Sequence, residues 1–182
     1  MDRSNITGNK NALPVAVVGR GDTLTARLLR GLTDSPVVEL TPCRAVISRE
    51  TGRYRAVVVE DFEPCDRRVL TPCAAVRWEL ACRADLVVVS LDSEEGRRLA
   101  DCVPGPVFTY SDGQPRADLS AEQVRLREDR LEFEALTRND LVRVRAGRYD
   151  RPRLYDHLAA LAGALALGVP LEQAAKQLSM IV

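Results

Sequence analysis

The sequence predicts an α/β protein with a mostly parallel sheet between two layers of helices, then an antiparallel β meander and two C-terminal helices. Two observations predict this fold class. Up to Tyr110, short apolar runs alternate with helical segments, an order that builds parallel strand-helix-strand units. From Val124 to Val144, apolar and polar residues alternate, as expected of antiparallel strands with one solvated face.

The parallel part begins with VAVVG (15–19), an apolar run closed by glycine that is typical of a strand buried on both faces. The leucines that follow have helical spacing, and either Asp22 or Thr23 is suited to cap this helix. The next expected elements are a strand over 36–40 and two strands around a turn at 50–52. A helix follows, with Thr71 as N-cap and Pro72 at its first position. After it we expect a strand within 84–92, a helix from Ser93 through Leu99 and a strand over 107–110.

The second half starts with a turn at SDGQP (111–115), after which the meander has turns at 128–129 and 138–140. A helix over 154–167 is ended by Gly168, and a second helix over 171–178 follows Pro170. We find no repeats or linkers. The chain therefore predicts a single domain over 14–182, preceded by a flexible N-terminal tail over 1–13.

Composition excludes several classes of protein. The 182 residues carry 26 basic and 26 acidic side chains, and this balance argues against a nucleic-acid partner. No apolar run reaches the length needed to cross a membrane, and the polar N-terminus lacks the apolar core of a signal peptide, so we expect a cytoplasmic protein.

The cysteines and the single histidine give no sign of a metal centre. The five cysteines have no C-x-x-C spacing, and we expect buried free thiols; they are Cys43, Cys65, Cys73, Cys82 and Cys102. His157 lies in the first turns of the alanine-rich helix beside Asp156. A lone histidine without a placed partner is a poor acid-base catalyst, so we assign it a packing or surface role.

The stretch VVGRGDTLTARLLRGL (17–32) has the strand-glycine-helix form of a phosphate-binding loop. Its candidate anion-binding residues are Gly19, Arg20, Gly21, Asp22 and Thr23. Such a loop normally carries a lysine that contacts the terminal phosphates, and here Asp22 stands near that position, where it would repel them. Three interpretations stay open: an ordinary strand-to-helix turn, a weak anion site, or a working nucleotide site.

The C-terminal segment LYDHLAALAGALALGVPLEQAAKQL resembles the end of the central, ATP-binding domain of the Mur ligases and of the related folylpolyglutamate and cyanophycin synthetases. LEFEALTRNDLVRVRAG, ADLVVVSLD and GPVFTYSDG occur in that family's order, and VAVVGRGDTLTARLLRGL stands where the family has its ATP loop. The resemblance covers about residues 14–180 and implies a P-loop-like sheet. It also implies a stand-alone central domain, because the family's flanking domains have no counterpart here.

The resemblance implies a site whose chemistry has been altered. Glu60, with Asp61 beside it, corresponds to the family's metal-binding glutamate, although solvated acids at a strand end are equally natural. The family's Asp-His signature is reduced to Asp92, and no lysine corresponds to its carbamylated residue. GRYDRPRLYD stands, in altered form, where the family has G-x-H-N before the last helix.

These departures favour a degenerate, non-catalytic Mur-ligase-like domain that has lost ATP-driven ligation and needs no cofactor. It would bind a partner protein, a second copy of itself, or a small ligand at the carboxyl ends of the strands. The alternative is an ATP- and Mg²⁺-dependent carboxylate-amine ligase subunit completed by a partner chain. A role in cell-wall processes follows from family analogy alone.

Overall fold

The computed structural model describes residues 13–19, 23–41, 52–60, 70–127, 130–148 and 151–181. Its helices are α1 (Leu24–Leu32), α2 (Leu70–Cys82), α3 (Glu94–Cys102), α4 (Arg151–Ala166) and α5 (Leu171–Ile181). Its strands are β1 (Val15–Val18), β2 (Val37–Leu40), β3 (Ala56–Val59), β4 (Val87–Ser90), β5 (Val107–Asp112), β6 (Leu119–Arg127), β7 (Arg130–Thr137) and β8 (Leu141–Arg148).

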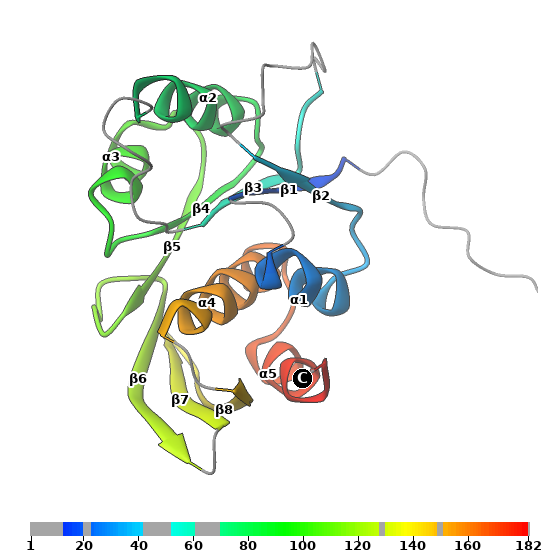
Figure 1. Ribbon diagram of the computed structural model, residues 1–182, viewed down its shortest axis with the longest axis vertical. Coiled ribbons are helices and arrows are strands. Elements are labelled where there is room, and N and C mark those ends of the chain that lie inside the picture. Colours follow the sequence, from blue (N-terminus) through cyan, green and yellow to red (C-terminus); the bar gives the residue numbers. More distant parts are fainter. Residues whose placement is uncertain are drawn as a thin grey trace, which may run out of the picture.

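All eight strands form one sheet in the order β2-β1-β3-β4-β5-β6-β7-β8. The strands from β2 to β6 pair in parallel, and β6, β7 and β8 pair antiparallel (Figure 1). The predicted fold class is therefore confirmed. The meander is continuous with the parallel sheet, since its first strand runs parallel to β5 and antiparallel to β7.

Two apolar cores lie on opposite faces of the sheet. The larger core joins α1, α4 and α5 to the sheet and includes the fully buried Tyr110 and Phe133. The smaller core lies under α2 and α3 and includes Ala81 and Leu99. Strands β1, β3 and β4 are buried along their whole length because helices cover both of their faces (Figure 1). The meander has helices on one face only (Figure 1).

Several element boundaries differ from the sequence predictions. Strand β6 begins at Leu119 rather than at Val124, α3 continues to Cys102, and α5 continues to Ile181. Helix α2 begins at Leu70, so Thr71 and Pro72 lie inside the helix rather than at its N-cap and first position. Ser111 and Asp112 were expected in a turn, but β5 extends through both. They belong to the strand because the carboxyl-terminal half of β5 pairs with β6. Helix α4 begins at Arg151 rather than Leu154. The strand expected before the turn at 50–52 lies outside the described residues.

The expectation of buried thiols is wrong for the two cysteines whose exposure is described. Cys82 and Cys102 are free, as expected, but both are exposed. Each is the last residue of its helix, α2 or α3, where the chain turns back toward the sheet, so the side chain lies outside the core. His157 packs in the interior at 2% exposure, and Trp78 is 40% exposed.

Candidate functional site at the carboxyl ends of the strands

The predicted loop lies where β1 and β3 end side by side. The Glu60 N–H donates to Val18 O (3.1 Å), and the Gly19 N–H donates to Leu40 O (3.0 Å). The carboxyl ends of three neighbouring parallel strands thus meet at Gly19, which is the usual place for a ligand in an open α/β sheet. Of the predicted site residues, Gly19, Thr23 and Glu60 are described and come together here. Arg20, Gly21, Asp22 and Asp61 lie outside the described residues.

Thr23 is the N-cap of α1, which settles the choice between Asp22 and Thr23. Its backbone is extended, with φ −86° and ψ 149°, and its hydroxyl accepts a hydrogen bond from the Ala26 N–H (3.3 Å). This contact satisfies one of the N–H groups that a helix leaves unpaired in its first turn. A Thr side chain therefore takes one of the donors that an anion at this helix end would use.

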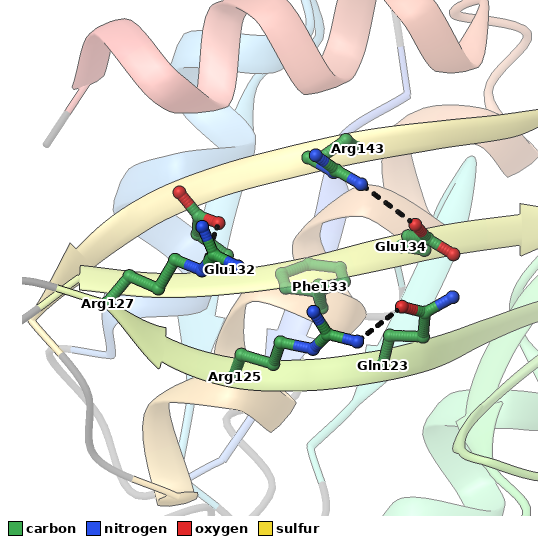
Figure 2. Close-up of a pocket in the computed structure, with 7 residues that line it drawn as sticks. All are labelled: Gln123, Arg125, Arg127, Glu132, Phe133, Glu134 and Arg143. Atoms are coloured by element: carbon green, nitrogen blue, oxygen red, sulfur yellow. Dashed lines mark hydrogen bonds and ion pairs between the residues drawn. The ribbon is translucent and has the colours of Figure 1, made fainter.

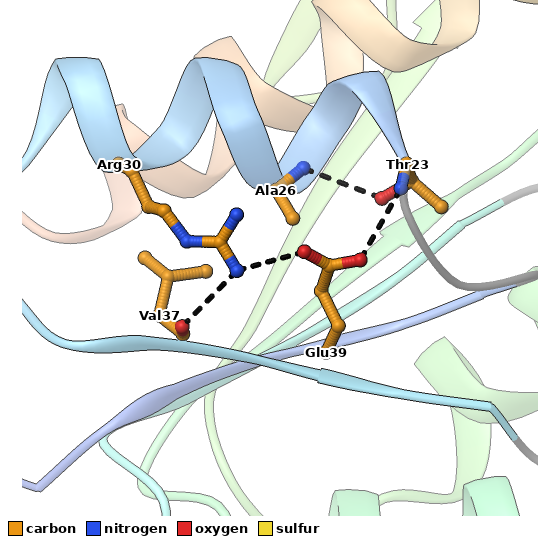
Figure 3. A network of polar contacts seen from close by, with 5 residues as sticks. All are labelled: Thr23, Ala26, Arg30, Val37 and Glu39. Carbon is orange, nitrogen blue, oxygen red and sulfur yellow. Dashed lines mark hydrogen bonds and ion pairs between the residues drawn. The ribbon is translucent and has the colours of Figure 1, made fainter.

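Glu39 was not identified from the sequence, yet its carboxylate lies at the N-terminus of α1 (Figure 3). Glu39 Oε2 accepts a hydrogen bond from the Thr23 N–H (3.3 Å), and Arg30 donates to Glu39 Oε1 (2.7 Å). The helix end, with its partial positive charge, therefore already has an anionic partner from the neighbouring strand β2. A lone acid in the short apolar strand VVEL was the only signal in the sequence.

The Glu60 side chain fills the space beside Gly19. A Cβ atom built on Gly19 would lie only 1.6 Å from Glu60 Oε2, so glycine is required here while the carboxyl group keeps this position. Glu60 is 9% exposed, and its Oε1 has no hydrogen-bond partner among the described residues. The strand-end acid is therefore a buried group and not a solvated one.

Burial raises the pKa of Glu60, because removal from water penalises the charged carboxylate. The hydroxyls of Thr25 and Thr23 lower it in part, whereas the negative charges of Asp156 and Glu39 raise it further. The net pKa shift is upward.

Asp156 brings a third carboxylate to the same region from α4. The buried Thr25 hydroxyl lies 3.4 Å from Asp156 Oδ1 and donates toward it. The acids Glu39, Glu60 and Asp156 thus lie around the first turn of α1, each from a different element. They do not converge on one point, and the described residues hold no group of three His, Cys, Asp or Glu arranged to bind a metal ion.

Asp92, the other residue implied by the resemblance, has a structural role. Its carboxylate accepts hydrogen bonds from Ser111 Oγ (2.6 Å), the Asp112 N–H (2.7 Å) and Gln114 Nε2 (2.6 Å). These contacts fasten the segment after β4 to the end of β5. The acidic oxygens of Asp92 are occupied by this network.

The fold is shared with solved structures of ligases. A UDP-N-acetylmuramoylalanyl-D-glutamyl-2,6-diaminopimelate–D-alanyl-D-alanyl ligase from Acinetobacter baumannii superposes with a TM-score of 0.76 over 92% of this chain, at 15% identity. The fold is that of the Mur ligase central domain. A UDP-N-acetylmuramate-alanine ligase from Thermotoga maritima gives a TM-score of 0.73 over 94% of the chain, at 14% identity.

The Mur ligase fold extends to a pseudomurein peptide ligase from Methanothermus fervidus, with a TM-score of 0.74 over 92% of this chain at 13% identity. The chain covers 46%, 45% and 49% of these three ligases, so it spans about half their length. No family model and no curated protein sequence matches the chain. Within the described residues, no helix is both long and apolar enough to cross a lipid bilayer.

Proposed function

We propose that the chain is a non-catalytic Mur-ligase-like domain that binds a partner or ligand and does not drive ligation with ATP. The observation that carries the proposal is the position of Glu39. Its carboxylate accepts a hydrogen bond from the Thr23 N–H at the N-terminal end of α1. In a loop of this form, a phosphate group would be expected to bind at that end.

The surrounding charges support the same proposal. A nucleotide brings several negative charges, and Glu39, Glu60 and Asp156 lie around the helix end that would have to receive them. In the sequence, Asp22 adds a fourth acid near the usual place of the lysine. Reversing one charge a few ångströms from a phosphate costs several kcal/mol, about 4 per unit charge at an effective dielectric of 20. We therefore expect ATP to bind poorly at these residues.

One observation favours the alternative, a ligase subunit completed by a partner chain. Thr23 and Glu60 are close enough for the Thr23 hydroxyl to lower the Glu60 pKa, and a hydroxyl with a carboxylate is a common pair of Mg²⁺ ligands. A partner could supply the missing cation and the second half of a nucleotide site. The protein should therefore be tested both alone and in its natural complex.

The decisive comparison uses labelled ATP with Mg²⁺ and two preparations: the purified chain, and the complex recovered with the chain from its own cells. We expect neither preparation to retain the nucleotide. Retention by the complex alone, lost on Glu60→Gln, would favour the partner-completed ligase over the proposal.

Two loop variants test the physical reason. Asp22→Lys places a cation where such loops normally carry their lysine. Glu39→Gln removes the negative charge that contacts the N-terminal end of α1. We expect measurable ATP binding only when the two substitutions are combined, since each removes one source of repulsion. If Asp22→Lys alone gives full binding, Glu39 is not the occupant that excludes phosphate.

A further inference from the structure

The outer face of the meander is the part of the sheet that no described helix covers (Figure 1). Arginine side chains project from this face, and the glutamate side chains between them are more buried. The side chains of Arg127, Arg143 and Arg145 are 64%, 62% and 65% exposed, whereas those of Glu132 and Glu134 are 19% and 14% exposed. A molecule approaching this face therefore meets guanidinium groups first.

A β-bulge in β6 determines which side chains reach this face. Glu122 pairs with Glu134 and Arg125 pairs with Glu132, so two residues of β6 lie opposite the single residue Phe133. Before the bulge, Leu119 and Ala121 face the core, and after it Val124 packs against the same core. Without the extra residue, strand alternation would turn Arg125 and Arg127 inward.

The bulge has a backbone cost. Gln123 adopts a positive φ of 49°, a left-handed conformation that is unfavourable for a residue with a side chain. Its side chain in turn holds Arg125, whose guanidinium donates to Gln123 Oε1 (2.8 Å; Figure 2). Bulges that re-aim a side chain are frequent next to binding sites.

Arg125 differs from the other arginines of this face in its partner. Arg143 pairs with Glu134, and both Arg127 and Arg145 pair with Glu132. Among the described residues, no carboxylate lies within ion-pair distance of Arg125, whose partner is a neutral amide. A guanidinium that is oriented but not neutralised is suited to bind a carboxylate through two parallel hydrogen bonds.

These residues enclose a shallow pocket between β6, β7 and β8 (Figure 2). It is lined by Gln123, Arg125, Arg127, Glu132, Phe133, Glu134 and Arg143. It is small and open to solvent, so it suits one acidic side chain better than a nucleotide. Leu141, 58% exposed and two residues from Arg143 on the same side of β8, offers an apolar contact beside it.

We propose that the outer face of β6–β8 is a docking site for an acidic segment of a partner protein, with Arg125 receiving one of its carboxylates. The partner segment also carries apolar residues, which cover Leu141. This site lies outside the strand-end site, and its existence does not depend on whether the chain binds a nucleotide.

The test measures binding of labelled peptides by fluorescence anisotropy. Three peptides of equal length alternate leucine with glutamate, with glutamine or with lysine. We expect saturable binding of the Glu-Leu peptide alone, weakening as salt is added, because exposed charges are screened. Binding of the Gln-Leu peptide with equal affinity, or no binding of the Glu-Leu peptide, would overturn the proposal.

Arg125→Gln should weaken binding of the Glu-Leu peptide about tenfold, the loss expected for a charge-assisted pair. Arg116→Gln is the matched control, since Arg116 is also exposed and also donates to a neutral amide, Gln114 Oε1 (3.2 Å), away from this face. Unchanged melting temperatures would show that both variants are folded. Equal affinities for wild type and Arg125→Gln would refute the assignment, as would binding of inorganic polyphosphate in place of the peptide.

Discussion

Glu60, a single residue at the strand ends, makes the stability of the fold depend on pH. Its carboxyl group is buried beside Gly19, and burial raises its pKa above the ordinary value of 4.5. The folded protein therefore holds this proton more tightly than the unfolded chain does. The stabilisation is fully present below the unfolded-state pKa and is lost as the pH rises through the folded-state pKa.

Glu60→Gln keeps the shape of the side chain and removes its titration. We expect the free energy of unfolding of the variant to rise relative to wild type as the pH increases above 4.5, with little difference at lower pH. Urea denaturation across this range measures the effect. Glu94→Gln, at a side chain that is 72% exposed, is the control. A wild-type advantage that grows with pH would contradict the burial of an uncompensated carboxyl group.

Thr23 stabilises the start of α1 through its side chain. Thr23→Ala removes the hydroxyl that accepts the Ala26 N–H, and we expect it to lower the free energy of unfolding by about 1 kcal/mol. Thr23→Ser keeps the hydroxyl and should lose much less. Equal losses for alanine and serine in chemical denaturation would show that the methyl group, not the cap, matters.

Elements differ in how well their sequences predicted them. The aliphatic runs of β1, β3 and β4 predicted buried parallel strands, because helices on both faces favour apolar side chains. The buried Ser90 at the end of β4 is the exception. The bulge in β6 was missed, although the apolar positions change parity between Ala121 and Val124. That change identifies a bulge only when the partner strand is known.

Helix α3 approaches the end of β4 so closely that its packing requires a glycine. A Cβ atom added at Gly96 would lie 1.9 Å from the Ser90 carbonyl oxygen, which belongs to the backbone and cannot rotate away. We expect Gly96→Ala to cost about 2 kcal/mol or more. Gly52→Ala, which meets nothing within 4 Å, should be near neutral. Equal melting temperatures for the two variants would show that α3 can move outward freely.

At the scale of the whole molecule, the order of elements was predictable and the chemistry of the site only in part. The alternation of strands and helices gave the fold of ligases that share only 13–15% identity with the chain. Thr23 and Glu60 were found from their places at element ends. Glu39 was not, because its contact with Thr23 joins residues 16 apart across β2 and α1, and no local pattern encodes it.

The chain has a Mur-ligase-like fold, and acidic side chains lie around the N-terminal end of α1. Together these two features lead to one specific expectation. The chain should keep its fold without a nucleotide, and adding a nucleotide should not raise its stability. Glu39 of β2 accepts a hydrogen bond from the Thr23 N–H, and Glu60, which follows β3, and Asp156 of α4 lie near the same helix end. We therefore expect this region to disfavour a phosphate group.

Calorimetric titration of the purified chain with ATP and Mg²⁺ tests this central claim most directly. We predict no saturable heat up to about 1 mM ATP, the upper end of ordinary substrate affinities. Saturable binding of one ATP per chain at micromolar concentrations, abolished by Thr23→Ala, would contradict the claim and establish a working nucleotide site.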